Sequence, residues 1–274
     1  MDSPPTTPHD PLLGQVLKGA YRLDDRLGEG GMGTVYVGTQ LIVDRQVAIK
    51  VLREAHLQGS AEMAAQLTKR FEREAMLTSR LEHPNTVKLI DFGRTRQGMF
   101  FLVLELLKGS PLSTAMRAGG PMPPERVAHI GRQIAMSLSE AHGQGIVHRD
   151  LKPDNVFLCN FAGATDFVKV LDFGISRMAN KETANQLTNT GVIVGTPTYM
   201  APEQVQGHEL VAQTDLYALG IILYEMLCGI PPFVAESVIA LAFKHVHEVA
   251  NPLPEHLGEE WQRVIGWLLA KNPS

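Results

Sequence analysis

The chain has 274 residues, 44% of them hydrophobic, and a formal net charge of −4. A chain of this length can bury a sizeable core, and its size favours one large domain or two lobes. Because acidic residues slightly outnumber basic ones, the composition excludes the globally basic footprint of a nucleic-acid-binding protein. Its cysteines, Cys159 and Cys228, are too few for a disulfide framework and fit a reducing compartment.

The N-terminal end predicts a leader without regular structure. Met1 to Pro11 is polar and proline-rich and lacks the apolar run of a signal peptide, so residues 1–20 are expected to form a disordered leader. The most apolar segment, Leu216 to Phe233, is interrupted by Glu225, which favours a buried core helix over a membrane span. No membrane segment is therefore expected within this chain.

Short apolar runs after the leader predict an antiparallel sheet. Tyr21–Leu27, Thr34–Val37 and Gln46–Val51 have the alternation and the β-branched or aromatic content of a meander. Further strands are expected at Val87–Asp91 and Met99–Glu105, the second of which is continuously apolar in its middle. The N-terminal part of the chain is therefore expected to be mainly sheet.

A glycine cluster with the pattern G-x-G-x-x-G separates the first two strands. Its residues are Gly28, Glu29, Gly30, Gly31, Met32 and Gly33. The same pattern marks Rossmann dinucleotide turns, but such a turn opens a helix, whereas Thr34 to Gly38 has the composition of a strand. No Gly-Lys-Ser/Thr follows at the spacing of a P-loop. The context favours a strand–loop–strand flap over phosphates, and the alternative is a plain glycine-rich hairpin.

Lys50 ends the strand sequence V-A-I-K. Alternation places Ala48 and Lys50 on one face of the strand, and Val47, Ile49 and Val51 on the other. A lysine on a strand is more often a solvated edge residue. Here a small residue beside it leaves room for a flat base and its phosphates.

The segment from Ala61 to Leu81 has helical periodicity, and two glutamates on it compete as partners for Lys50. At about 100° per residue, Glu74 falls in the middle of the apolar stripe and Glu72 on the opposite, solvated face. A carboxylate on an apolar face needs a cationic partner, because burying it alone is costly. Glu74 is therefore predicted to pair with Lys50.

Beyond the strands the sequence predicts a mainly helical region. The expected helices are Leu112–Ala118, Pro123–Gly143, Thr214–Cys228, Val238–Val246 and Trp261–Leu269. Three histidines in this region, His245, His247 and His256, have a spacing broken by proline, so they are expected to be surface residues rather than metal ligands.

Two polar turns between apolar runs carry the strongest pattern. The first, Ile146 to Phe157, contains Asp150 and Asn155, and the second, Val170 to Gly174, contains Asp172. A carboxylate that accepts a hydroxyl proton, with an amide and a second carboxylate that hold magnesium, is the set that phosphoryl transfer from ATP requires. H-R-D-L-x-x-x-N followed by D-F-G belongs to the protein kinase signature. The chain therefore resembles the protein kinase family.

Other motifs extend this resemblance from Tyr21 to Ser274. Lys152-Pro153 resembles the serine/threonine branch, and Leu27 to Tyr36 resembles bacterial eukaryotic-like serine/threonine kinases. The resemblance implies an α+β, two-lobed protein kinase fold. It places a small antiparallel β-sheet lobe with one helix over residues 21–104, a hinge over 105–108 and a larger, mainly helical lobe over 109–274.

The resemblance also assigns roles in the turn from His148 to Asn155, called here the catalytic turn. Asp150 is the expected catalytic base, and Lys152 is expected to steady the γ-phosphate. Asn155 and Asp172 are the expected magnesium ligands. Because phosphoryl transfer depends mainly on positioning and charge neutralisation, loss of any of them should lower kcat strongly and barely affect folding.

The resemblance implies an ATP site on the sheet lobe and the hinge. Lys50, held by Glu74, is expected to contact the α- and β-phosphates, and Val35 with Ala48 to cover the adenine. Leu104 would line the back of the pocket. The implied ATP-binding residues are Leu27, Gly28, Glu29, Gly30, Gly31, Met32, Gly33, Thr34, Val35, Ala48, Lys50, Glu105, Leu107 and Phe157. The backbone of Glu105 and Leu107 is expected to bond the adenine, and Phe157, where a smaller aliphatic residue is usual, to narrow the pocket.

The long stretch between Asp172 and the Ala-Pro-Glu at 201–203 shows little periodicity and resembles a kinase activation segment. Thr188 and Thr190 have the spacing of activating phosphothreonines in related bacterial kinases and are predicted autophosphorylation sites. The alternative is that they are ordinary polar loop residues. A phosphate there would neutralise Arg149 and order the segment.

Two residues are expected to support the catalytic turn. Thr196 is expected to bond Asp150 and Lys152. Asp215 has the position of an ordinary helix N-cap, but the resemblance implies that it reaches the backbone of His148 and Arg149.

One departure concerns the end of the chain. In kinases the glutamate of Ala-Pro-Glu, here Glu203, pairs with an arginine further along, and the sequence stops at Ser274 before it. The resemblance therefore implies a fragment of a longer protein, or a truncated product of low stability.

The favoured hypothesis is a cytoplasmic serine/threonine protein kinase that uses ATP and Mg²⁺, acts on protein substrates and has no nucleic-acid partner. Self-association for trans-autophosphorylation fits it. One alternative is an ATP-binding pseudokinase that serves as a scaffold, although such proteins normally have lost Lys50, Asp150 or Asp172. The other is a small-molecule phosphotransferase of the same fold, which usually lacks the peptide-docking segment from Gly195 to Glu203.

Overall fold

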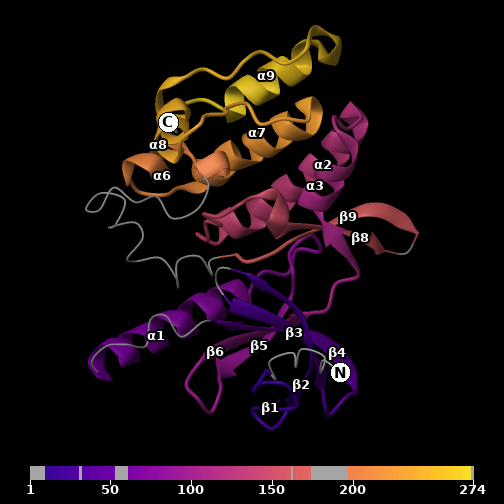
Figure 1. Ribbon diagram of the computed structural model, residues 1–274, viewed down its shortest axis with the longest axis vertical. Helices are drawn as coiled ribbons and strands as arrows, with labels where there is room; N and C mark the ends of the chain where they lie inside the picture. The colour runs from indigo at the N-terminus through magenta and orange to yellow at the C-terminus, as the bar shows by residue number, and fades with distance from the viewer. Residues whose placement is uncertain (1–9, 31–32, 53–60, 162, 174–196, 273–274) are drawn as a thin grey trace, which may run out of the picture. The chain divides into compact units, whose positions relative to one another are not determined.

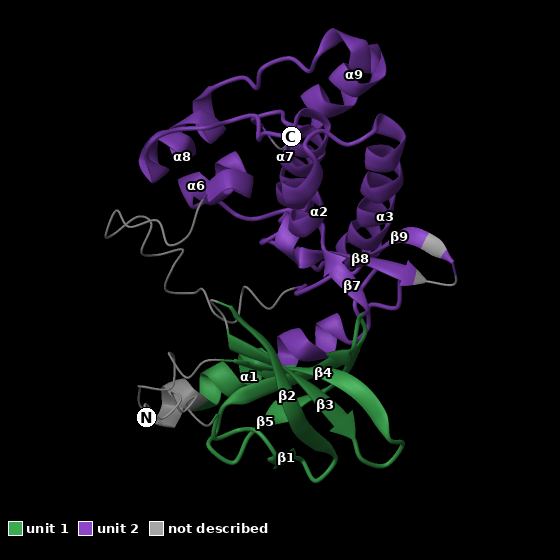
Figure 2. Cartoon of the chain, turned by 45° about the vertical axis from the view of Figure 1, so that its right-hand side comes forward, with its two compact units in different colours: residues 1–72, 88–107 green, residues 73–87, 108–274 purple. Residues whose placement is uncertain are grey.

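The computed structural model describes residues 10–30, 33–52, 61–161, 163–173 and 197–272. The chain forms two compact units: residues 1–72 with 88–107 (unit 1), and residues 73–87 with 108–274 (unit 2) (Figure 2). Unit 1 is mainly sheet and unit 2 mainly helix, which confirms the predicted α+β fold. The division after Leu107 lies inside the expected hinge.

Unit 1 is built on a six-stranded antiparallel sheet with the order β1-β2-β3-β4-β6-β5 (Figure 1). The strands are β1 (Val16–Leu17), β2 (Tyr21–Gly30), β3 (Gly33–Gln40), β4 (Arg45–Leu52), β5 (Leu89–Arg94) and β6 (Phe100–Glu105). β2, β3 and β4 form the predicted meander. Alternation along these strands buries Tyr36, Ile49 and Val103 together in the core of the unit. Helix α1 (Ala61–Thr78) begins in unit 1 and ends in unit 2.

The segment that begins at Asp10 is part of unit 1. Leu12 and Leu17 are buried, and the second lies in β1, which pairs with β2. The Tyr36 hydroxyl donates a hydrogen bond to the Asp10 carboxylate at 2.8 Å. The disorder expected over residues 1–20 is therefore wrong for this segment, because its leucines bury apolar surface against the sheet. The residues before Asp10 lie outside the described part of the chain.

Unit 2 combines helices with a small sheet of order β7-β8-β9. The elements are β7 (Gly109–Pro111), α2 (Leu112–Gly119), α3 (Pro124–Gly143), η1 (Pro153–Asn155), β8 (Val156–Phe161), β9 (Ala164–Val170), η2 (Pro197–Tyr199), α6 (Pro202–Gln206), α7 (Ala212–Cys228), α8 (Val238–His247), η3 (Glu255–Leu257) and α9 (Gly258–Leu268). The predicted helices are thus present, with ends that differ by a few residues. None of the helices described here is both long and apolar enough to cross a membrane.

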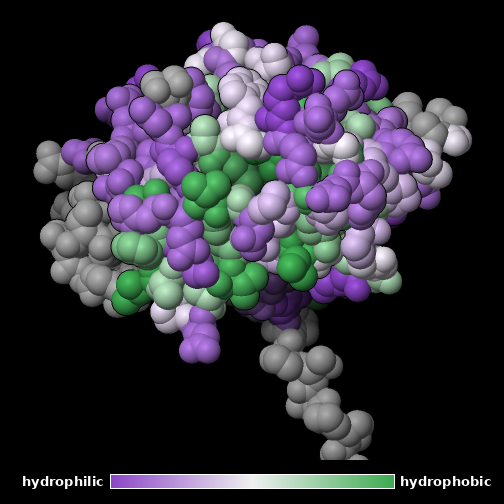
Figure 3. Space-filling model, turned by 90° about the horizontal axis from the view of Figure 1, so that it is seen from above, coloured by the Kyte–Doolittle hydropathy of each residue, from purple (hydrophilic) through white to green (hydrophobic). Residues whose placement is uncertain are grey.

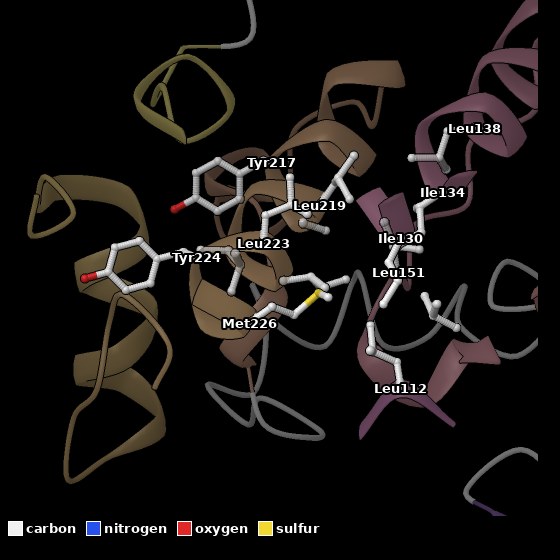
Figure 4. Close-up of a cluster of buried hydrophobic side chains, with 14 of the residues drawn as sticks. Leu112, Ile130, Ile134, Leu138, Leu151, Tyr217, Leu219, Leu223, Tyr224 and Met226 are labelled. Carbon is white, nitrogen blue, oxygen red and sulfur yellow. The ribbon is translucent and has the colours of Figure 1, made fainter. Parts of the chain in front are cut away.

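Helices α3 and α7 pack closely and form the centre of unit 2 (Figure 4). Ile134 of α3 and Leu223 of α7 are buried in one cluster, which also contains Leu151 of the catalytic turn. At Gly131 a Cβ atom would lie 2.7 Å from a methyl group of Leu223, so a larger residue there would require the Leu223 side chain to shift. Leu151 thus anchors the catalytic turn in the core of the unit.

Residues 73–87 belong to unit 2, although the sequence analysis placed them in the N-terminal lobe. The backbone N–H of Val87 donates to the Val170 carbonyl at 2.9 Å. The backbone N–H of His83 donates to the Glu140 carboxylate at 3.0 Å. These hydrogen bonds between residues distant in sequence assign the segment to the helical unit.

His245 is not the surface residue that was predicted, since it is fully buried between α7 and the end of the chain. Its Nδ1 atom lies 3.1 Å from the Tyr217 hydroxyl, and its ring packs against Phe233. Lys271 donates to the Tyr217 hydroxyl at 3.0 Å and to the His245 carbonyl at 2.8 Å. Burial and the Lys271 charge lower the pKa of His245 to about 4. The other two histidines are exposed, as predicted.

Helix α9 exposes apolar side chains. Val264 and Trp267 are 43% and 71% exposed, whereas Ile265 is buried. Figure 3 views the molecule from the side on which α9 lies in Figure 1, and apolar residues gather there within a hydrophilic surround.

Candidate active site

The glycine flap is a strand–loop–strand hairpin formed by β2 and β3. Gly30 pairs with Gly33, and β3 rather than a helix follows, which excludes the Rossmann alternative. Gly33 has a φ of 156°, and a Cβ atom there would clash with the Val51 carbonyl oxygen, so this position requires glycine. Gly31 and Met32 lie outside the described residues.

One face of the unit 1 sheet carries the side chains expected near the adenine and its phosphates. Lys50 pairs with Val35 on one side and with Leu102 on the other. Ala48 pairs with Leu104. Paired residues share a face, as do alternate residues of one strand, so these five side chains lie on the face opposite the core. We call it the Lys50 face; it confirms the predicted alternation of Ala48 and Lys50.

At the end of β6, the backbone N–H of Glu105 already has a hydrogen-bond acceptor. The Glu105 N–H donates to the Lys88 carbonyl at 3.1 Å, and the Glu105 carboxylate accepts from the Lys88 N–H at 2.8 Å. A backbone hydrogen bond between Glu105 and an adenine would therefore have to use the Glu105 carbonyl oxygen as the acceptor. Leu107 is half-buried, and its contact with adenine stays a prediction.

The two glutamates of helix α1 lie on the faces of the helix that were predicted for them. Glu74 is buried, with 8% of its surface exposed, and Glu72 is exposed. The assignment of faces from the helical period is thus confirmed. Glu74 belongs to unit 2 and Lys50 to unit 1, and their pairing stays a prediction.

The catalytic turn brings three of the predicted residues together. Lys152 Nζ donates to Asp150 Oδ2 at 2.8 Å. Asn155 Nδ2 donates to the Asp150 carbonyl oxygen at 2.7 Å and lies 3.3 Å from Oδ2. The Asp150 side chain is 33% exposed, so its carboxylate is held firmly and still reaches solvent.

Asp215 supports this turn from α7. Its Oδ1 accepts from the Arg149 N–H at 2.8 Å, and its Oδ2 accepts from the His148 N–H at 2.7 Å. His142 Nε2 also lies 2.7 Å from Oδ2. The carboxylate is 1% exposed and satisfied by these polar partners, as a buried charge must be. Asp215 lies in the first turn of its helix, yet its carboxylate bonds the catalytic turn, as the resemblance implied.

Arg149 has a left-handed backbone, with a φ of 70°. A non-glycine residue in this region is strained and keeps the conformation only when its surroundings impose it. The bond from its N–H to Asp215 is one such constraint.

Asn155 and Asp172 lie at the same end of the β8–β9 hairpin. Asn155 precedes β8 and Asp172 follows β9, and these strands pair with Val156 opposite Val170. The Leu171 N–H donates to the Asn155 carbonyl at 2.8 Å, which closes this end. A second contact holds the segment, since His148 Nε2 lies 2.7 Å from the Leu171 carbonyl.

These two side chains fit a magnesium ion. Asn155 directs its amide nitrogen to Asp150, which leaves the amide oxygen as a metal ligand. Mg²⁺ prefers oxygen ligands and usually binds one or two protein carboxylates together with substrate phosphates and water. In the described part of the chain, no group of three or more His, Cys, Asp or Glu residues is placed to hold a metal ion.

Sequence reasoning missed the links between the Ala-Pro-Glu segment and its surroundings. Glu203 is buried, and its Oε1 accepts from the Thr214 hydroxyl at 2.6 Å. Tyr199 donates to Glu225 Oε2 at 2.7 Å, and burial raises the pKa of both groups. The sequence did hold a signal for this pair, because Glu225 interrupts the most apolar segment and a buried acid needs a donor.

Gln204 was also missed. Its Nε2 donates to the Arg149 carbonyl at 2.8 Å, and its Oε1 accepts from the Ala201 N–H at 3.0 Å. A glutamine at the start of a helix has no pattern that would single it out. Of the other predicted residues, Thr188, Thr190 and Thr196 lie outside the described residues.

Comparison with known proteins agrees with this geometry. The family model described as protein kinase domain matches residues 21–274. The chain therefore belongs to the protein kinase family.

Its relatives include bacterial serine/threonine-protein kinases. The chain is 43% identical to Pkn1 of Myxococcus xanthus over 99% of its own length and 38% of the relative. It is 38% identical to pkn3 of the same organism, over 97% of the chain and 49% of the relative. It is also 38% identical to PknB of Mycobacterium tuberculosis, over 94% of the chain and 40% of the relative. The chain thus spans half or less of the length of these relatives.

Proposed function

We propose that the chain is the catalytic domain of a serine/threonine protein kinase that transfers the γ-phosphate of ATP to Ser and Thr hydroxyls of proteins. The observation that carries this proposal is the Asp150 carboxylate, held by Lys152 and Asn155 on a turn that Asp215 supports. The family and the names of the relatives agree with it.

Asp150 is the proposed base. Lys152 and Asn155 both approach its Oδ2, so Oδ1 is the oxygen proposed to accept the proton of the substrate hydroxyl. Lys152 stands beside that carboxylate and can place its positive charge against the transferred phosphoryl group, where negative charge develops.

Asn155 and Asp172 are the proposed magnesium ligands. When bound, the ion would neutralise the charge of the β- and γ-phosphates. The β8–β9 hairpin and the Leu171 contacts keep both ligands at one end of the unit 2 sheet.

The Lys50 face is the proposed support for the nucleotide. Ala48 and Val35 would cover the adenine, and Lys50, paired with Glu74, would contact the α- and β-phosphates. The small side chain of Ala48 supports this role, because it leaves room above the sheet. Within this proposal the glycine flap covers the phosphates, the hinge backbone bonds the adenine, and Phe157 narrows the pocket.

Regulation is proposed to act through the activation segment. Thr188 and Thr190 are the proposed autophosphorylation sites, with Arg149 as the charge that a phosphate would neutralise. Protein substrates and a second copy of the chain are the proposed partners. Since ATP and reduced thiols are found inside the cell, the domain is proposed to act in the cytoplasm.

The test uses the purified chain with γ-labelled ATP, Mg²⁺ and casein. Wild type should label casein, and Asp150→Asn should lower the rate by about 10³-fold without lowering the melting temperature. The control is Asp154→Asn. Asp154 is an exposed acid of the same turn that accepts a hydrogen bond from Ser113, and its substitution should change the rate of casein labelling little. ATP binding without transfer by wild type would instead support the pseudokinase, and label found only in small hydroxyl compounds would support the small-molecule phosphotransferase.

A further inference from the structure

We infer that Gln204 is a positioning residue that sets the orientation of the catalytic turn through the Arg149 carbonyl group. The inference rests on the proposed function, in which Asp150 is the catalytic base. It concerns how that base is held, because Gln204 acts through the Arg149 carbonyl group and not on a reacting group.

Gln204 bridges two backbone segments with both ends of its amide. Its nitrogen donates to the Arg149 carbonyl at 2.8 Å, and its oxygen accepts from the Ala201 N–H at 3.0 Å. The amide therefore cannot rotate without losing both bonds. The side chain is half-buried, so water competes less well for these groups than at an exposed site.

The residue that Gln204 contacts is the strained one. Arg149 has a φ of 70°, a conformation that an arginine keeps only when its neighbours impose it. Asp215 holds the N–H side of Arg149 at 2.8 Å. Gln204 holds the carbonyl side. The two side chains thus restrain the peptide groups on both sides of the strained Cα atom.

The restrained carbonyl belongs to the peptide that leads into Asp150. Rotation of this peptide would move the Asp150 N–H, which lies 3.3 Å from His148 Nδ1, and would swing the carboxylate with it. Misplacement of a reacting group by about 1 Å can lower a rate by about 10²-fold. Gln204 also fixes Ala201, so it couples the start of α6 to the position of the base.

Three substitutions at Gln204 test the two hydrogen bonds of its amide separately. Gln204→Leu removes both bonds. Gln204→Glu keeps an oxygen for the Ala201 N–H and loses the donor to Arg149. Gln204→Lys keeps a donor within reach of the Arg149 carbonyl and loses the acceptor. Matched controls are the same three substitutions at Gln206, an exposed residue of the same short helix.

The measurement is casein phosphorylation by the purified chain, with kcat and the KM for ATP determined separately. We expect Gln204→Leu and Gln204→Glu to lower kcat by about tenfold, with the KM for ATP within about twofold of wild type. Gln204→Lys should recover most of the lost kcat, because the donor to Arg149 is restored. The Gln206 variants should match wild type. Gln204→Leu should melt at a somewhat lower temperature, because two hydrogen bonds are lost, but it should remain folded at the assay temperature.

Three results would overturn the inference. In the first, Gln204→Leu has the kcat of its Gln206 counterpart. In the second, Gln204→Lys loses as much kcat as Gln204→Glu. In the third, the loss of kcat is matched by an equal loss of folded protein in thermal melts and ATP-binding capacity, which would mean a structural role alone. Asp150→Asn, measured in parallel, separates the two proposals. If Asp150→Asn keeps its activity, the proposed function fails. If Asp150→Asn loses activity but the Gln204 variants keep the kcat of wild type, only this inference fails.

Discussion

The Lys50 face of unit 1 and the catalytic turn of unit 2 are held in different ways. On the Lys50 face, Ala48 and Lys50 take their directions from strand alternation and from a ladder of paired backbone groups on both sides. In the catalytic turn, the strained Arg149 is held by single side chains, with Asp215 on one side and Gln204 on the other. A ladder is redundant, whereas we expect the turn to depend on each of these side-chain bonds. Substitutions should therefore affect the face through the space they fill and the turn through the bonds they remove.

Among the residues that support the catalytic turn, the largest effect is expected from Asp215→Ala. The change leaves the buried N–H groups of His148 and Arg149 without their acceptor, each at a cost of about 1–3 kcal/mol. The released turn should lower kcat by about 10²-fold or more. Kinetics and denaturant unfolding of the same preparation measure both losses. A variant with a kcat near that of wild type would show that the turn does not depend on Asp215.

His245, which is buried against Tyr217, Phe233 and Lys271, extends the comparison to a polar group of unit 2 outside the catalytic turn. The pKa of His245 is about 4 in the folded chain, below its ordinary value of 6.5. Between these values the unfolded chain binds a proton that the folded chain does not. Stability is thus complete above pH 6.5 and falls as the pH drops toward 4, by on the order of 1–2 kcal/mol at pH 5.

Thermal melts at pH 7 and pH 5 test this. Wild type should lose more stability between the two values than His245→Gln, whose side chain does not titrate. The exposed His256→Gln serves as control and should follow wild type. Equal losses in wild type and His245→Gln would contradict the expected coupling of burial and protonation.

Ala48→Leu tests the Lys50 face. The added carbons would occupy the space proposed for the adenine, so the KM for ATP should rise by about tenfold while kcat changes little. Ile49→Val is the matched change on the opposite face, where the side chain lies in the core of unit 1. It should cost about 0.5–1.5 kcal/mol of stability and leave the KM unchanged. An unaltered KM in Ala48→Leu would remove this face from the nucleotide site.

The smallest effect is expected from Tyr36→Phe. The change removes the hydroxyl that donates to Asp10 and should lower the stability of unit 1 by about 1 kcal/mol. Asp10→Asn keeps an acceptor for this hydroxyl and should lower the stability by less. Denaturant unfolding measures both variants. No change in Tyr36→Phe would mean that the buried leucines and the pairing of β1 with β2 hold the segment without this hydroxyl.

The faces on which side chains lie in regular strands and helices could be predicted from the sequence. The period of 2 in β4 assigned Ala48 and Lys50 to one face, and the period of 3.6 in α1 turned Glu74 inward and Glu72 outward. Repeating geometry makes these assignments local, since each depends only on neighbours within one strand or helix. The residues of the catalytic turn were found through their spacing in a known signature.

The tertiary structure alone decided the contacts between distant residues. Gln204 lies 55 positions from Arg149, and Lys271 lies 26 from His245. Neither pair has a local pattern, because hydrogen bonds across such separations depend on how whole elements pack. For the same reason, residues 73–87 were placed in the N-terminal lobe, and the segment after Asp10 was expected to be disordered. The sequence by itself determined the family, the elements and the side of each element that faces inward; only the fold decided which side chains support the catalytic turn.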